Sequence, residues 1–314
     1  MREETNHKKA VVMRSAGLWY DLQDEAGNIL KGRLRGIFKK DKNKVTNPIA
    51  VGDYVHFEIE DVEEKTALIT KILPRNNYVI RESTHKKTHG HIIAANIDQA
   101  ILVATLVFPR TSLGFIDRFL VSTESFRIPT IIIFNKIDLL NDEGIAYQNE
   151  LAALYNNLGY ECLHVSATER TNLDVLHEKI KSKTTLLSGH SGVGKSTLLN
   201  QLDNNIEQKT AEVSMYAQKG KHTTTFAEMF VLGTDSYMID TPGIKEFGIL
   251  DIENNELGFY FPEIKAVMNQ CKYHNCSHTH EPGCVVKDLI EDGKIAESRY
   301  ISYLSILENE DNRR

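Results

Sequence analysis

Short runs of β-branched and aromatic residues fill the first 75 residues of the chain, and turn-forming or charged segments separate them. The runs cover residues 11–23, 28–37, 53–60 and 66–73. Strands of this number and length are typical of a small closed barrel of the OB type. A generic β-sandwich fits the same pattern about as well.

The pattern changes between residues 92 and 245, where apolar runs alternate with amphipathic stretches. The apolar runs are typical of buried strands and cover residues 97–107, 130–136, 161–167, 184–189, 229–232 and 236–240. The amphipathic stretches between several of them cover residues 115–126, 145–158 and 172–180. This alternation predicts a parallel sheet covered by helices, as in α/β domains.

Beyond residue 245 the pattern is helical, at residues 261–270, 285–293 and 294–309, and a group of cysteines and histidines interrupts it. Pro74 and the basic, His-rich stretch 81–91 mark the link between the first two regions. We therefore predict three domains. They are a β-barrel of the OB fold over residues 1–75, an α/β phosphate-loop domain over 76–245 and a mostly α-helical domain over 246–314.

Composition and charge narrow the class of protein. The chain has 314 residues and a net charge of −6, from 37 basic and 43 acidic side chains. This balance argues against a simple basic nucleic-acid coat protein. No apolar run reaches the roughly 18 residues of a membrane-spanning helix, and the charged N-terminus shows no secretory signal. We expect a cytoplasmic protein without membrane contact, and a monomer.

Residues 189–196 read GHSGVGKS and match the phosphate-loop motif G-x-x-x-x-G-K-S/T. The motif follows the apolar run TTLLS and precedes the helix-forming KSTLLNQL, which is the context that phosphate binding requires. We expect Lys195 to reach the β- and γ-phosphates, and Ser196 to ligate Mg²⁺. The predicted nucleotide-binding residues of this motif are Gly189, His190, Ser191, Gly192, Val193, Gly194, Lys195, Ser196 and Thr197.

A second phosphate motif, Asp240-Thr-Pro-Gly243, comes directly after the apolar run SYMI. We expect Asp240 to hold Mg²⁺ through water and the amide of Gly243 to contact the γ-phosphate. Taken alone, DTPG is equally typical of a structural turn. The phosphate loop about 45 residues upstream favours the phosphate-binding interpretation.

The tetrapeptide Asn135-Lys-Ile-Asp138 closes another apolar run. An aspartate can accept hydrogen bonds from the N1 and N2 donors of guanine, and adenine lacks that pair, so Asp138 would select GTP over ATP. Asn135 would bind the other base edge, and the stem of Lys136 would lie over the ring. Ser166-Ala167 follows the next strand, where a backbone N–H would contact the guanine carbonyl oxygen. NKID alone is also a common surface tetrapeptide.

These motifs stand in an unusual order. Most phosphate-loop GTPases carry the phosphate motifs first and the base motifs last, whereas here NKID and Ser-Ala precede GHSGVGKS and DTPG. The chain is therefore circularly permuted, which is mild for a domain whose ends lie close together.

Together with AANIDQ (94–99) and GKHTTT (220–225), the motifs in this order resemble the RsgA (YjeQ) family of circularly permuted bacterial GTPases. Members of that family assist late assembly of the small ribosomal subunit. The resemblance implies a GTPase that binds GTP and GDP with Mg²⁺. It also implies that the barrel and a zinc-binding domain bind the maturing 30S particle with its 16S rRNA, and that hydrolysis times release.

Residues 221–225, KHTTT, lie where a mobile switch loop is expected. One threonine should ligate Mg²⁺ when GTP is bound, and the resemblance favours Thr224 over its neighbour Thr223. Many GTPases place a glutamine after D-x-x-G to orient the attacking water, but this chain has Ile244 there. We therefore expect slow intrinsic turnover with catalytic roles for Lys195, Thr224 and His222. His222 could equally contact RNA.

The cysteine and histidine cluster reads Cys271-x4-Cys276-x-His278-x5-Cys284. Three thiolates and one imidazole suit tetrahedral Zn²⁺, and four protein ligands leave no open position for catalysis, so a single structural zinc ion is expected. His274 and His280 are competing nitrogen ligands, and the family spacing favours His278.

A basic stretch over residues 31–44 holds seven Lys and Arg residues against Asp41 alone, which gives +6. This makes one barrel face a candidate RNA-binding surface, although a basic run is also typical of a merely solvated face. Trp19, Tyr20 and Phe38 could stack on bases, although such residues are more often part of the core. Residues 245–314, at −5, are a poorer phosphate binder. The candidate RNA-binding residues are Lys31, Arg33, Arg35, Lys39 and Lys40.

Two other interpretations remain open. The chain could be a nucleotide-regulated module that binds RNA or the ribosome and hydrolyses GTP negligibly, which Ile244 favours. It could also be an ATP-driven phosphate-loop enzyme, if Asp138 does not select guanine.

Overall fold

The computed structural model describes residues 8–35, 48–82, 90–202, 227–233, 235–240 and 252–308. The chain forms two compact units that interleave along the sequence. The first unit comprises Met1–Gln99, His177–Ser188 and Leu199–Glu246, and the second comprises Ala100–Leu176, Gly189–Leu198 and Phe247–Arg314. None of the helices in the described part of the chain combines the length and apolar character needed to span a lipid bilayer.

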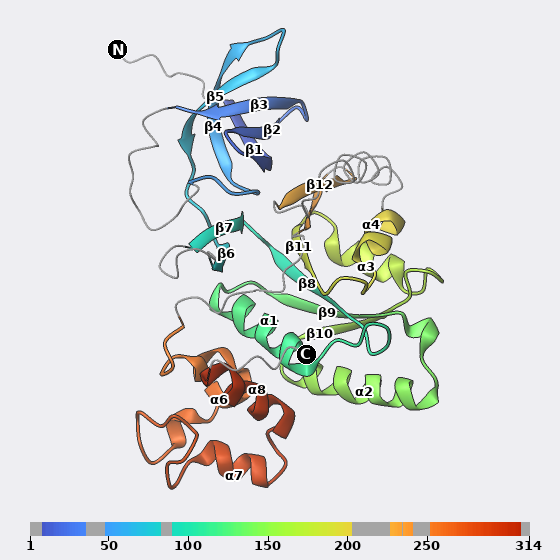
Figure 1. Ribbon diagram of the computed structural model, residues 1–314, viewed down its shortest axis with the longest axis vertical. Coiled ribbons are helices and arrows are strands. Elements are labelled where there is room, and N and C mark those ends of the chain that lie inside the picture. The colour runs from blue at the N-terminus through green and yellow to red at the C-terminus, as the bar shows by residue number, and fades with distance from the viewer. Residues whose placement is uncertain are drawn as a thin grey trace. The chain divides into compact units, whose positions relative to one another are not determined.

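Five strands at the start of the first unit form a closed barrel (Figure 1, blue). They are β1 (Lys8–Ala16), β2 (Trp19–Asp24), β3 (Ile29–Leu34), β4 (Tyr54–Asp61) and β5 (Thr66–Ile72). Strand β1 pairs with β2, β2 with β3, β3 with β5, β5 with β4, and β4 again with β1. Because the last pairing closes the ring, the OB-like barrel is confirmed and the β-sandwich is excluded.

Alternating side chains from these strands fill the barrel. Val12, Leu22, Val55 and Ile69 are completely buried, and the residues on either side of Leu22, Val55 and Ile69 are more exposed. This period of two is the pattern that the sequence predicts for a strand with one apolar face. The alternation is broken in β1, where Met13 beside Val12 is also buried and the register with β2 shifts.

Three further strands of the first unit are β11 (Thr184–Ser188), β12 (Glu228–Leu232) and β13 (Ser236–Asp240). Strand β11 runs parallel to β13, as expected for an α/β sheet, but β12 runs antiparallel to β13. The prediction of a wholly parallel sheet is therefore wrong at β12. The reason is geometric, because only three residues join β12 to β13, which suffices for a hairpin but not for a helical crossover.

The link after the barrel contains a two-stranded antiparallel sheet of β6 (Tyr78–Glu82) and β7 (Gly90–Ala95). The basic composition of residues 81–91 predicts a linker here, and the short apolar runs on either side of it form the two strands.

The second unit contains a parallel sheet in the order β10 (Glu161–Val165), β9 (Thr130–Asn135) and β8 (Gln99–Ala104). Every residue of β8 and β9 is buried, which explains their continuous apolar sequences. The helices α1 (Leu113–Ser125) and α2 (Asp142–Asn157) begin at the N-caps Ser112 and Asn141, whose side chains accept backbone N–H bonds. The segments η2 (Ile137–Leu139), α3 (Leu173–Ile180) and α4 (Lys195–Leu202) are shorter.

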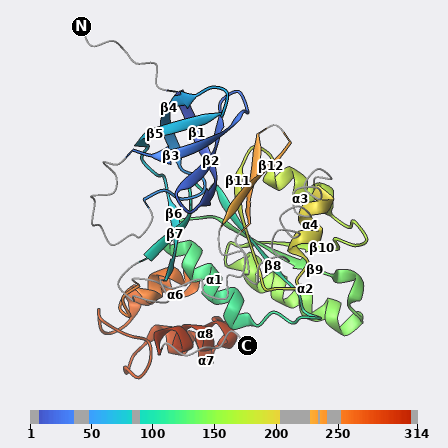
Figure 2. The ribbon, with the colours of Figure 1, turned by 45° about the horizontal axis from the view of Figure 1, so that its top comes forward.

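The C-terminal segment of the second unit is mostly helical. It contains η3 (Leu257–Tyr260), α6 (Pro262–Lys265), η4 (Met268–Gln270), α7 (Val285–Glu291) and α8 (Glu297–Leu307). These elements bury a core that includes Phe261, Val286 and Tyr303 together with Val121 of α1. Figures 1 and 2 show α1 beside this segment.

A buried ion-pair network also joins α1 to this segment. Arg299 of α8 is 1% exposed and donates to Asp117 of α1 at 2.7 Å and to Glu263 of α6 at 2.7 Å. Tyr155 of α2 donates to the same Asp117 oxygen at 2.8 Å. Burial disfavours the charged guanidinium, but the two carboxylates hold the pKa of Arg299 above the usual value for arginine.

Candidate functional site

The phosphate-loop motif lies between β11 and α4 and adopts backbone angles that only glycine tolerates easily. Gly189, Gly192 and Gly194 have φ angles of +148°, +83° and +97°. A Cβ atom on Gly189 would lie 2.4 Å from the Val103 carbonyl oxygen, and one on Gly194 would lie 2.4 Å from Asn135 Nδ2. The glycines of the motif are therefore required for the turn and for its close approach to neighbouring backbone.

Lys195 begins α4, and its ammonium turns back over the loop. Lys195 Nζ donates to the carbonyl oxygens of Gly189 at 2.7 Å and His190 at 2.9 Å. Ser191, Gly192, Ser196 and Thr197 are exposed. The loop thus presents a cation and the start of a helix at an accessible surface, which suits an anionic phosphate group.

Asn135 ties the guanine motif to the phosphate loop. This residue ends β9, is 3% exposed, and donates from Nδ2 to the Val193 carbonyl oxygen at 2.8 Å. Its Oδ1 accepts the backbone N–H of Ala167 at 3.1 Å. Both ends of the amide therefore bond protein, so Asn135 positions the two loops, and its contact with the base edge stays a prediction.

Lys136 also connects the guanine motif to the phosphate loop through a hydrogen bond. Its backbone is left-handed, with φ of +65°, and its Nζ donates to the carbonyl oxygens of Phe108 at 2.6 Å and Gly192 at 2.7 Å. The side chain therefore reaches the phosphate loop, and its contact with a guanine ring stays a prediction.

Asp138 is exposed and accepts a hydrogen bond from the hydroxyl of Ser166. Ser166 and Ala167 directly follow β10, and Asp138 lies three residues after the end of β9, which pairs with β10. The predicted guanine-reading residues thus meet at the carboxyl ends of two neighbouring parallel strands, where ligands bind in open α/β sheets.

His190 has a neighbour that sequence reasoning missed. Its ring lies 3.7 Å from the ring of Phe115, measured between centroids, and Phe115 is in the first turn of α1. A Cβ atom on Gly192 would also lie 3.4 Å from Pro109. No motif in the sequence marks Phe115 or Pro109, because both contacts join segments that are distant in sequence.

The remaining predicted phosphate and switch residues are only partly described. Asp240 ends β13, and Leu187 of β11, two residues before the phosphate loop, is its register partner in the sheet. The residues His222, Thr223, Thr224, Gly243 and Ile244 lie outside the described residues.

The predicted zinc ligands Cys271, Cys276, His278 and Cys284 come together in the C-terminal segment, with all four ligand atoms within 4.8 Å of one another. The Sγ atoms of Cys271 and Cys284 are 4.0 Å apart, and His278 Nδ1 lies 3.6 Å and 3.5 Å from them. A tetrahedral Zn²⁺ site with ordinary bond lengths gives about 3.8 Å between sulfurs and about 3.5 Å between sulfur and nitrogen. The cluster therefore fits a zinc ion.

The electrostatics of the cluster also favour a cation. Burial, and then the neighbouring Cys284 and Cys271, raise the pKa of Cys276 to about 12. Thiolates packed this closely are stable only when a positive ion neutralises them. The two competing histidines lie elsewhere, since His274 is exposed and His280 contacts Thr279 at 2.8 Å.

Hydrogen bonds hold the loop that carries His278. His278 has a left-handed backbone with φ of +60°, and its carbonyl oxygen accepts from Tyr300 of α8 at 2.6 Å. Glu281 accepts bonds from the backbone and hydroxyl of Ser277, both at 2.7 Å, and from the Thr279 amide at 3.2 Å. Although burial opposes it, these bonds lower the pKa of Glu281 to about 2.

The candidate RNA face of the barrel is less cationic than the sequence indicates. Arg33 makes a bidentate ion pair with Glu60, with both bonds at 2.7 Å, and Lys31 pairs with Asp21. Arg35 is exposed, whereas Lys39, Lys40 and Phe38 lie outside the described residues. Trp19 is 44% exposed beside Arg33 on the next strand, and Tyr20 is a core residue.

Two protein-family models match this chain. The model of the RsgA GTPase family matches residues 72–250, and the model of the RsgA N-terminal domain matches residues 9–69. The small ribosomal subunit biogenesis GTPase RsgA of Bacteroides fragilis is 47% identical over 303 residues, which cover 96% of this chain and 97% of that protein.

Two solved structures are similar over the whole chain. The crystal structure of YjeQ from Thermotoga maritima has a TM-score of 0.77 and 32% identity, and the match covers 98% of this chain and 100% of that one. The structure of YloQ, a circularly permuted GTPase, has a TM-score of 0.75 and 30% identity, with coverage of 100% and 99%. The permuted order that the motifs indicate is therefore confirmed.

Proposed function

This chain belongs to the RsgA GTPase family, and from that premise we propose that it binds the maturing small ribosomal subunit. GTP hydrolysis would couple late assembly of the 30S particle to release of the GTPase. The name of the Bacteroides fragilis relative, a small ribosomal subunit biogenesis GTPase, supports this function. We place its action in the cytoplasm, where ribosomal subunits are assembled, and propose that it acts as a monomer.

The main support for the proposal is that hydrogen bonds connect the phosphate loop to the guanine motif. Asn135 and Lys136 each bond a carbonyl oxygen of the phosphate loop, at 2.8 Å and 2.7 Å. A GTP molecule that spans both motifs would therefore meet loops whose spacing is already set. Asp138 would select guanine, and the backbone of Ala167 would contact the guanine carbonyl oxygen.

Catalysis would rest on positioning and on charge neutralisation. Lys195 would neutralise charge on the β- and γ-phosphates, while Ser196, Thr224 and Asp240 would hold Mg²⁺. When bound, Mg²⁺ supplies positive charge at the phosphate oxygens. His222 would position the attacking water, because Ile244 cannot do so. If subunit-stimulated turnover is unchanged in His222→Ala, the histidine has the RNA-contacting role instead.

Ile244 favours a second candidate function, in which the nucleotide only regulates binding to the ribosome and hydrolysis is negligible. GTPase rates with and without purified 30S subunits separate the two. The proposed function requires stimulation by the subunit, whereas a nucleotide-regulated binding module shows none.

We further propose that the cysteine and histidine cluster holds one structural Zn²⁺ per chain, through Cys271, Cys276, His278 and Cys284. The donor set and the spacing of its atoms support zinc. Metal analysis after purification without chelators should find about one zinc per chain, and substantially less would contradict the assignment.

The barrel is the proposed contact for 16S rRNA, through Lys31, Arg33, Arg35, Lys39 and Lys40. Because Lys31 and Arg33 already pair with carboxylates, RNA phosphates would have to compete with Asp21 and Glu60. The exposed Trp19 beside Arg33 would add a stacking surface.

Co-sedimentation with purified 30S subunits tests the proposed function. The full chain should bind more in a non-hydrolysable GTP analogue than in GDP, because hydrolysis is proposed to trigger release. Lys195→Ala is the matched control, since loss of phosphate binding should abolish the difference. Equal binding of the wild type in both nucleotides would overturn the release mechanism.

A further inference from the structure

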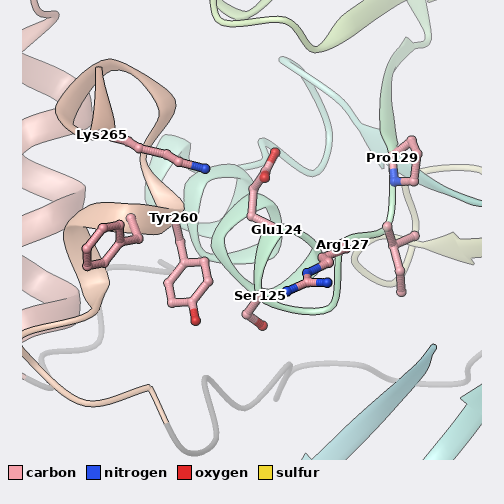
Figure 3. Close-up of a pocket in the computed structure, with 8 residues that line it drawn as sticks. Glu124, Ser125, Arg127, Pro129, Tyr260 and Lys265 are labelled. Carbon is pink, nitrogen blue, oxygen red and sulfur yellow. The ribbon is translucent and has the colours of Figure 1, made fainter. Parts of the chain in front are cut away.

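The second unit has a cavity of about 580 Å³ that neither the nucleotide motifs nor the metal cluster uses. It lies where the end of α1 and the turn into β9 meet η3 and α6 (Figure 3). Its lining includes Ser125, Arg127, Phe259, Tyr260 and Lys265. We propose that this cavity binds one nucleotide unit of single-stranded RNA, with the phosphate held by Arg127 and Lys265 and the base stacked on Phe259.

The charge of the lining suits a phosphate. Arg127 and Lys265 are both exposed, and within the described ranges neither cation takes part in an ion pair. Glu124 is the one acidic residue of the lining, and Figure 3 shows its carboxylate facing the Lys265 amine while the Arg127 guanidinium lies beside Ser125. The lining therefore carries a net charge of +1, and its one carboxylate faces Lys265 rather than Arg127.

Aromatic side chains lie next to these cations. Phe259 is 49% exposed, which leaves much of its ring available to a ligand. Tyr260 follows it in η3 and also lines the cavity. Exposed aromatic rings beside Lys and Arg are the usual means by which proteins bind unpaired RNA bases, because every base can stack on a ring.

The size of the cavity suits one nucleotide, since sites for small molecules measure about 300 to 1,000 Å³. Residues 245–314 carry a net charge of −5, so the local pair of cations, together with the aromatic rings beside it, has to supply the attraction for one phosphate and its base. The inference rests on the proposed function, since the small ribosomal subunit would supply the RNA strand.

Cross-linking locates the contact in the full chain. The probe is an oligouridine of about 12 nucleotides that contains 4-thiouridine, a length suited to single-strand binding sites. After irradiation, mass spectrometry should find cross-links in the peptide that contains Phe259 and Tyr260. Cross-links confined to barrel peptides would overturn the proposal.

Single substitutions measure the contribution of each group. Phe259→Ala should weaken binding of the oligouridine at this site at least about fivefold. Arg127→Ala and Lys265→Ala should each lower the salt dependence, as the slope of log affinity against log salt, by about 0.7. The matched controls are Ile301→Ala, at an apolar residue that is 54% exposed, and Lys294→Ala, at an exposed lysine paired with Asp292.

The same variants separate failure of this inference from failure of the proposed function. If wild-type protein binds 30S subunits but the three cavity variants bind as their controls do, the RNA cavity is wrong and the proposed function stands. If the wild type itself does not bind 30S subunits, the proposed function is wrong. Equal affinity of the cavity for uridine monophosphate and for the oligouridine would contradict the assignment to an RNA strand.

Discussion

Replacement of Arg299 by methionine should loosen the packing of the C-terminal segment against α1. The guanidinium makes hydrogen bonds to Asp117 at 2.7 Å and to Glu263 at 2.7 and 3.3 Å. It also lies over the ring of Phe261, with the guanidinium carbon 4.6 Å from the centroid. The Arg299→Met substitution fills similar space but leaves two carboxylates without their cation.

The expected loss follows from the burial of these groups. The side chains of Arg299 and Asp117 are each 1% exposed and that of Glu263 is 8% exposed, so water cannot replace the lost charge. Removal of one partner from a buried ion pair destabilises a protein by about 3 to 5 kcal/mol. Tyr155 still donates to Asp117, which places the expected value toward the lower end of that range.

Hydrogen–deuterium exchange of the zinc-loaded protein, followed by mass spectrometry, is the suitable assay because it reports on α1 and α8 separately from the barrel. A loss of 3 to 5 kcal/mol corresponds to about 100-fold to 4,000-fold faster exchange in these helices. Lys294→Met is the control, since its exposed pair with Asp292 should contribute less than about 1 kcal/mol.

Two results would refute this reasoning. One is a change in the exchange of α1 and α8 no larger than that of the control. The other is equally faster exchange in β1 to β5, because the barrel belongs to the other compact unit and has its own core.

Three further predictions concern the nucleotide and metal sites. Asn135→Ala removes the side-chain partner of the Val193 carbonyl and of the Ala167 amide. GTP affinity, measured with a fluorescent analogue, should therefore fall about 10- to 100-fold. The control Asn141→Ala, at the N-cap of α2, should leave GTP affinity unchanged. Asp138→Asn should shift the nucleotide preference from GTP toward XTP in competition assays, and an unchanged preference would contradict the guanine assignment. Glu281→Gln should speed zinc loss to a chelator at pH 7. The pKa of Glu281 is about 2 in the folded protein, below the ordinary 4.5. The carboxylate therefore stabilises its loop fully above about pH 4.5. The difference in loop stability between the wild type and Glu281→Gln should vanish as the pH falls to about 2.

Features that depend on neighbouring residues in the sequence were predictable. The phosphate loop, the guanine motif and the spacing of the metal ligands are each set within a few residues, because the backbone there must take particular angles or bring ligands to one ion. Short β-branched and aromatic runs predicted a β-rich N-terminal region, but they fitted a barrel and a β-sandwich about equally, because the pattern alone could not show that β4 returns to pair with β1.

Features that depend on contacts between distant residues were not predictable. Asp117 and Arg299 lie 182 positions apart, and each has the sequence context of an ordinary surface residue on an amphipathic helix. The charge of the basic run over residues 31–44 could not be judged from the sequence for a related reason. Asp21 and Glu60, on other strands, pair with Lys31 and Arg33.

The distant contacts form a continuous path through the second unit. Near one end of α1, Phe115 packs on His190 of the phosphate loop, and two residues further on Asp117 binds Arg299 of α8. The next residue of α8, Tyr300, holds the carbonyl oxygen of the metal ligand His278.

Apolar residues of similar volume could pack as well as a buried ion pair, so packing alone does not account for these charges. The bonds of Arg299 connect α8 to α1 and to α6, since the guanidinium meets Asp117 and Glu263 together. The same helix carries Tyr300 and Tyr303 to the metal loop, where Tyr303 donates to the Ser277 carbonyl at 2.9 Å. The contacts of the metal loop therefore lead through α8 to α1, the same helix whose first turn contacts the phosphate loop.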